Sequence, residues 1–130
     1  MYCETTHGIR VSVKPRFLPE QSSPAESRYF WAYTVEIANE TGAPVQVLAR
    51  HWVITDANGH RQDVRGPGVV GEQPIVTPGD SFTYTSGCPL TTPSGIMAGT
   101  YEVREPGGEV FQVAIPAFSL DLPGARQILN

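Results

Sequence analysis

The chain has 130 residues, 40% of them hydrophobic and 17% charged, which is enough for a single domain (residues 1–130) that buries its own core. Its net charge of −4 and isoelectric point near 5.2 argue against broad attraction to nucleic acid or to an anionic membrane. The 12 prolines and 13 glycines are too many for a helical bundle and predict many turns.

The N-terminus has neither a basic region nor an apolar stretch of the secretory kind, and no segment has the 18 or more apolar residues that a membrane span needs. We therefore expect a cytoplasmic protein without membrane insertion. Because the cytosol is reducing and the N-terminus is expected to be mobile, the two cysteines, Cys3 and Cys88, are predicted to be free thiols.

Strand-like alternation begins at residues 9–14, where hydrophobic and polar side chains alternate. A longer aromatic strand follows at residues 29–38, and residues 39–42 are expected to end it as a hairpin-type turn. Most aromatic side chains of this strand are predicted to be core, and Phe30 is the one expected to be exposed because it lies on the opposite parity from Trp31.

The rest of the chain repeats this pattern of short strands and turns. Strands are predicted around residues 45–54, 60–65, 75–76, 82–85, 101–103 and 111–115. The turns and loops between them are residues 56–59 with an Asn-Gly pair, the glycine loop 66–71, residues 77–80, a long loop at 86–95, and residues 106–108.

The predicted fold is all-β, an immunoglobulin-like or fibronectin type III-like antiparallel sandwich of seven to eight strands. No stretch of 10 residues shows a helical stripe. The segment at residues 99–103 resembles a tyrosine corner, in which the Tyr101 phenol would bond a nearby backbone group.

Three glycines, Gly66, Gly68 and Gly71, spell the G-x-G-x-x-G pattern of dinucleotide-binding loops. That motif must open a helix, whose N-terminus holds the pyrophosphate. Here Pro74 and Pro78 follow within a few residues, and they exclude a helix in this register. The glycines are therefore predicted to form a tight loop between strands.

Arg61 and Arg65 flank the short strand that leads into this loop, while Asp63 and Glu72 lie close enough in sequence to offset their charge. Two interpretations remain open. The arginines and the loop amides could form an anion-binding nest, or the strand could be an exposed edge kept soluble by alternating charges.

Catalytic and metal chemistry have weaker support. The histidines, His7, His51 and His60, are scattered and lack ligand spacing, so no metal or other cofactor is expected. Cys88 could be a nucleophile only with a base such as His51, and a small buried hydrophobe explains it equally well.

Taken in order along the chain, many segments together resemble the ApaG family of small bacterial proteins. They are residues 28–33, 50–52, 54–59, 65–73, 84–90, 93–95, 97, 99, 101 and 115–120. The resemblance implies a fibronectin type III-like sandwich, a domain also used in eukaryotic F-box proteins and in a polymerase-associated protein. It further implies a link to cobalt resistance and magnesium efflux, without an established reaction.

The function expected from the sequence is a non-enzymatic module that binds another protein and is linked only indirectly to divalent cations. Its candidate binding residues are Arg61, Arg65, Gly66, Gly68, Gly71 and Glu72. The alternative is a small-ligand protein that holds a phosphate-bearing nucleotide at the same loop. Nucleic acid is not an expected partner, and an edge strand offers a route to weak self-association.

Overall fold

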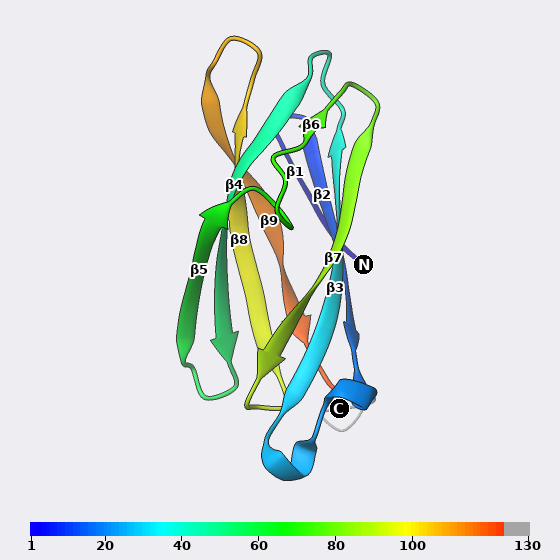
Figure 1. The fold of residues 1–130 in the computed structure, drawn as a ribbon, viewed down its shortest axis with the longest axis vertical. Coiled ribbons are helices and arrows are strands. Elements are labelled where there is room, and N and C mark those ends of the chain that lie inside the picture. The colour runs from blue at the N-terminus through cyan, green and yellow to red at the C-terminus, as the bar shows by residue number, and fades with distance from the viewer. Residues whose placement is uncertain (124–130) are drawn as a thin grey trace.

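The computed structural model describes residues 1–123 and contains two antiparallel β-sheets packed face to face (Figure 1). The first sheet has the spatial order β1 (Tyr2–Thr6), β2 (Ile9–Phe17), β3 (Tyr29–Asn39), β7 (Ser81–Leu90). The second has the order β5 (Arg61–Pro67), β4 (Val45–Asp56), β8 (Gly95–Arg104), β9 (Val110–Leu120), and β6 (Ile75–Val76) pairs with the start of β4. The predicted all-β sandwich is confirmed, with nine strands instead of seven or eight.

Helical structure in residues 1–123 is limited to two 3₁₀ turns, Pro19–Gln21 and Pro24–Glu26, between β2 and β3. Each has a proline in its first turn, where the missing N–H costs nothing. None of the helical segments within this range has the length and apolarity to cross a membrane.

The core lies between the sheets and follows the period-2 alternation of the strands. In β3, Trp31, Val35 and Ile37 are at most 1% exposed, whereas the residues of opposite parity at positions 32, 34 and 36 are half-buried. Phe30 is half-buried and not the exposed residue that was expected. The largest fully buried side chains are Trp31, Tyr101, Phe118, Ile9, Ile37, Met97 and Leu120.

A β-bulge changes which face of β4 is buried. Val47 pairs with Val103, but Ala49 pairs with Glu102, so Leu48 is the extra residue. Odd-numbered residues point into the core before the bulge and even-numbered residues after it, as the burial of Val47 and Trp52 shows. This switch turns Arg50 toward the space between the sheets.

The N-terminus is a paired strand, so the expectation of a mobile segment was wrong. β1 pairs with β2 along its whole length. It also closes one side of the sandwich, because the hydroxyls of Tyr2 and Ser119 on β9 lie 3.1 Å apart and the Ala114 amide donates to Thr6 at 3.2 Å. Cys3 is exposed and Cys88 is buried, and both thiols are free, as predicted.

The segment after β3 is a crossing between the sheets and not the predicted hairpin turn. β3 and β4 belong to different sheets. The side chain of Asn39 is 1% exposed and joins the crossing to β6, because its Nδ2 donates to the carbonyls of Ala43 and Val76, both at 2.8 Å. Turn-forming residues at 39–42 therefore identify the end of a strand but not where the chain goes next.

The long loop predicted at residues 86–95 was also wrong, because β7 continues to Leu90. Its pairing with β3 is continuous to the last residue, Leu90 opposite Tyr29. Pro89 is tolerated since β7 is the last strand of its sheet, and an edge strand need not donate every amide. Gly87 leaves room for the Phe30 ring, whose Cζ would lie 2.6 Å from a Cβ at that position.

Tyr101 does not form a tyrosine corner. Its hydroxyl shares a hydrogen bond with the hydroxyl of Tyr84, which belongs to the opposite sheet. Burial raises the pKa of both phenols, so they stay neutral. The bond is thus a buried link between the two sheets.

Candidate functional site

The glycine-rich segment forms a tight turn between strands, as predicted, and no helix follows it. The amides of Val69 and Glu72 each donate to the other residue's carbonyl, at 2.7 and 2.9 Å, and the Gly68 amide donates to the Leu48 carbonyl at 2.7 Å. These three amides already have carbonyl acceptors and are not available to an anion. The chain then enters β6 at Ile75.

Two of the three motif glycines have a positive φ, which is +61° at Gly68 and +82° at Gly71. They differ in their surroundings. A Cβ at Gly68 would lie 2.0 Å from the carbonyl oxygen of Glu72, whereas nothing lies within 4 Å of a Cβ at Gly71. Gly68 therefore permits a close backbone contact, and Gly71 serves the turn conformation alone.

Val70 occupies the tip of the turn in a conformation that its side chain disfavours. Its φ is +42°, and a β-branched residue in the left-handed region is a clear outlier. With Gly71, it gives the two positive φ values that two-residue type I′ turns require, where Asn-Gly is the usual pair. Val70 is 52% exposed while its neighbour Val69 is fully buried. The turn is thus anchored by one valine and presents the other to solvent.

The guanidinium of Arg61 is paired with a carboxylate of its own strand, β5. Its Nε donates to Oδ1 of Asp63 at 2.8 Å, and Nη2 donates to Oδ2 at 3.2 Å. His51 on β4 contacts the same carboxylate at 2.8 Å. These hydrogen bonds, first from Arg61 and then from His51, hold the pKa of Asp63 well below its usual range. The carboxylate stays ionised and neutralises the arginine that the nucleotide interpretation needs.

The six predicted residues do not converge on one pocket. Arg65 is 71% exposed in its side chain and lies 3.9 Å from Asp63. Together with Gly66 it lines a shallow depression of about 430 Å³ on the outer face of the second sheet, which Thr100, Glu102 and Gln112 also border. Arg61 does not line this depression, and Gly68, Gly71 and Glu72 belong to the turn beyond it.

Arg50 was missed by the sequence reasoning although it lies beside the turn. Its Nη1 donates to the carbonyl oxygens of Pro67 at 2.9 Å and of Gly68 at 3.1 Å. Its guanidinium packs on Gly66, where a Cβ would lie 3.0 Å from Nη1 and Nη2. The switch of buried parity between Val47 and Trp52 was the signal that could have identified Arg50 as an inward-facing charge.

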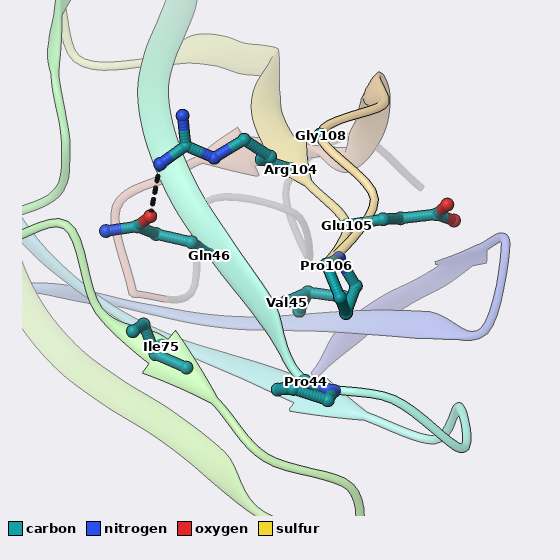
Figure 2. Close-up of a pocket in the computed structure, with 8 residues that line it drawn as sticks. All are labelled: Pro44, Val45, Gln46, Ile75, Arg104, Glu105, Pro106 and Gly108. Carbon is teal, nitrogen blue, oxygen red and sulfur yellow. Dashed lines mark hydrogen bonds between the residues drawn. The ribbon is translucent and has the colours of Figure 1, made fainter.

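A second depression of about 400 Å³ lies where the start of β4 meets β6 and the β8–β9 hairpin (Figure 2). Its rim is mainly apolar and includes Pro44, Pro106 and Ile75, the last 65% exposed. Arg104 donates from Nη2 to Oε1 of Gln46 at 2.7 Å, as Figure 2 shows. The groove offers apolar contact, and two of its polar side chains, Gln46 and Arg104, are already bonded to each other.

Cys88 has the surroundings of a structural thiol. Its residue is 2% exposed, and burial raises the pKa of the thiol to about 11. The base suggested for it, His51, is engaged with Asp63 on the outer face of the second sheet, whereas Cys88 lines the space between the sheets. Within residues 1–123, no group of three or more His, Cys, Asp or Glu side chains could hold a metal ion.

We predict that at pH 7 the native protein reacts with a disulfide reagent such as DTNB at Cys3 alone, and that Cys88 reacts only on unfolding.

The raised pKa of Cys88 also makes the stability of the protein depend on pH. Between about pH 9 and pH 11 the Cys88 thiol keeps its proton in the folded protein and loses it in the unfolded chain. The stability that the bound proton provides is intact below about pH 9 and is lost toward pH 11, by roughly 1.4 kcal/mol per pH unit.

Denaturant unfolding at pH 8 and pH 10 measures this loss. Cys88→Ala is the reference because it retains every other titrating group, including the buried tyrosines. An equal loss of stability in the wild type and in the variant would contradict the pKa shift, and rapid reaction of Cys88 in native Cys3→Ser protein would contradict its burial.

Comparison with known proteins gives consistent matches over the chain. Residues 19–105 match the family model described as ApaG domain. The chain is 58% identical to Protein ApaG of Beijerinckia indica and 58% identical to Protein ApaG of Brucella anthropi, each over 130 residues that cover 100% of both chains. A crystal structure of an ApaA protein from Bordetella pertussis is 50% identical and superposes with a TM-score of 0.86, covering 94% of this chain and 96% of its own.

Proposed function

Because the chain belongs to the ApaG family, we propose that it is a binding module without catalytic activity, which acts by holding another protein. The contact surface comprises β5 and the turn at residues 66–72, and so contains all six residues predicted from the sequence. A cytoplasmic location and an indirect link to Co²⁺ and Mg²⁺, through the bound partner, are parts of the same proposal.

Val70 is the observation that carries this proposal. An exposed apolar side chain at a turn tip contributes little to folding, and its positive φ costs about 1 to 3 kcal/mol. Asparagine would fit the turn better and would be more soluble. Val70 thus lowers the stability of the isolated protein. A bound partner that buries its isopropyl group would explain the valine, because that burial contributes to the free energy of binding.

The nucleotide alternative has less support from the same contacts. Arg61 is paired with Asp63, and three amides of the turn already donate to carbonyls. Arg65 has no hydrogen bond to Asp63, but it too lies 3.9 Å from that carboxylate, in a protein whose net charge is −4. Calorimetry with mono- and dinucleotides at millimolar concentration is expected to give no saturable signal, and a signal lost on replacing both arginines would reinstate the alternative.

We predict that Val70→Asn stabilises the protein and weakens partner capture. The free energy of unfolding should rise by about 1 kcal/mol, because asparagine tolerates the left-handed conformation better than valine. Capture of partner proteins from lysate by the immobilised variant should fall, since the apolar contact is removed. Chemical denaturation and quantitative mass spectrometry of the captured proteins measure the two effects.

The matched control is Ile96→Asn, which makes the same kind of change at an apolar residue that is 54% exposed on β8. This variant should retain capture. Undiminished capture by Val70→Asn, or an equal loss in both variants, would exclude the turn tip as a contact point. A gain in stability accompanied by a loss of binding cannot be explained by misfolding.

A further inference from the structure

A cleft of about 240 Å³ lies between the sheets on the side that β1 and β9 do not close. It runs between β5 and β7, each the last strand of its sheet. The residues that line it are Tyr33, Arg50, Trp52, Ile54, Gln62, Val64, Ser86, Gly87, Cys88, Pro89 and Met97. Arg50 is the only charged side chain in this lining.

The guanidinium of Arg50 is held in place but retains donors for a ligand. Nη1 is fixed by the carbonyls of Pro67 and Gly68, and within residues 1–123 no acceptor is hydrogen-bonded to Nε or Nη2. No carboxylate of the described chain lies within ion-pair distance of Arg50. Nε and Nη2 form the edge of a guanidinium that binds a carboxylate through two parallel hydrogen bonds.

The walls of the cleft fit an apolar group next to that charge. Trp52 and Met97 are buried at 3% and 1% exposure, and Ile54 and Val64 are half-buried beside them. Tyr33, Gln62 and Ser86 add polar groups to the lining. A half-buried cation beside apolar side chains attracts an anion more strongly than the same cation in water does. A volume of about 240 Å³ is smaller than the pockets of drug-sized ligands and suits one side chain with its charged group.

The number of positive charges in the cleft indicates which kind of anion it can bind. A phosphate group carries about two negative charges and is normally held by several cations or free amides. Here one arginine lines the cleft, Arg61 is paired with Asp63, and three amides of the turn, those of Gly68, Val69 and Glu72, already donate to carbonyls. A single carboxylate matches a single guanidinium. The two flanking edge strands offer backbone groups to an extended chain, which a free small acid would not use.

We propose that this cleft binds the C-terminal carboxylate of a partner polypeptide whose last side chain is apolar. The carboxylate lies on Nε and Nη2 of Arg50, the last side chain fills the space beside Trp52, and the preceding residues extend along the edge of β5 or β7. This inference rests on the proposed function, because it names the part of the bound partner that is recognised. The cleft is a place on the protein separate from Val70.

The test uses fluorescein-labelled hexapeptides, Gly-Ser-Gly-Ser-Ala followed by Val, Leu, Phe or Trp, each made with a free and with an amidated C-terminus. Fluorescence anisotropy with the whole protein is expected to show saturable binding of at least one free-acid peptide and binding about 30-fold or more weaker for its amide. Arg50→Gln should cause a similar loss, and Arg50→Lys a partial one. Arg65→Gln, an arginine on the outer face, should have no effect.

Arg50→Gln also removes the bonds to Pro67 and Gly68, so a second variant leaves Arg50 intact. Val64→Phe fills the cleft from β5 and should abolish binding, while thermal unfolding confirms that it is folded. Equal binding of acid and amide, absence of binding to every peptide, or sensitivity to Arg65→Gln alone would overturn the proposal. Competition by 4-methylpentanoate or phenylacetate at the affinity of the peptides would overturn the polypeptide as occupant.

Failure of the cleft proposal can be distinguished from failure of the proposed protein-binding function. If the peptides fail but capture from lysate still depends on Val70, the cleft is excluded and the turn surface stands. If the peptides bind through Arg50 and capture is insensitive to Val70→Asn, the turn surface is excluded and the cleft stands.

Discussion

Replacing Gly68 with alanine is expected to lower the free energy of unfolding by about 4 kcal/mol, a large part of the total for a domain of this size. Two costs add. The residue has φ of +61°, and its Cβ would lie 2.0 Å from the Glu72 carbonyl oxygen, so the turn must open. Opening the turn would also loosen the bonds from Arg50 to the carbonyls of Pro67 and Gly68.

Gly71→Ala is the matched control, because it has a similar φ of +82° but open space around the added Cβ. It should lose about 1 kcal/mol, the cost of the left-handed conformation alone. Urea unfolding of both variants measures the difference. Similar losses for Gly68→Ala and Gly71→Ala would show that the close contact with Glu72 is not formed in solution.

Local patterns in the sequence correctly predicted the structural features that depend only on residues close together in the chain, namely turns and the buried faces of strands. The Asn58-Gly59 pair closes the β4–β5 hairpin with φ of +84° at Gly59, and residues 106–108 turn β8 into β9. Alternation in β3 identified the buried face correctly. These features follow from backbone conformation and from the period of a strand, both of which are visible in a short window.

Features that depend on pairing between distant strands were not predictable in this way. β7 extends to Leu90 through Gly87 and Pro89, both poor strand formers, because β3 supplies a partner along its length. The hydroxyl of Tyr101 reaches Tyr84 on the other sheet instead of a nearby backbone group. In each case a contact from far along the chain overrode the local signal.

In the candidate site, too, the local features were predicted and the contacts between distant strands were not. Prolines after Gly71 correctly excluded a phosphate-binding helix. The sequence could not reveal that Asp63 neutralises Arg61, since His51 from another strand fixes the same carboxylate. The hydrophobic pattern changes parity between Val47 and Trp52, but it does not locate the bulged residue, Leu48, which decides whether Arg50 faces solvent or the space between the sheets.

Asn39 holds the crossing between the sheets through hydrogen bonds of both its side chain and its backbone. Its Nδ2 donates to the carbonyls of Ala43 and Val76, and its Oδ1 accepts from the backbone amide and the hydroxyl of Thr41, at 2.9 and 2.6 Å. Its backbone amide and carbonyl bond residues Asp80 and Gly79. One buried residue thus joins the end of β3 to β6 through its side chain and to the turn after β6 through its backbone.

Asn39→Asp should therefore lower the free energy of unfolding by about 3 kcal/mol or more at pH 7, although it changes the shape of the side chain very little. A carboxylate oxygen would replace Nδ2 opposite two carbonyl oxygens, in a site that is 1% exposed. Burial and these carbonyls would raise the pKa of the new carboxyl above its unfolded value, so the loss should shrink as the pH falls and the protonated acid donates one bond. Urea unfolding from pH 7 to pH 4, compared with the wild type at each pH, measures both effects. A loss below about 1 kcal/mol at pH 7, or one that grows on acidification, would mean that Asn39 is not the donor to Ala43 and Val76 and that the crossing is held by backbone bonds alone.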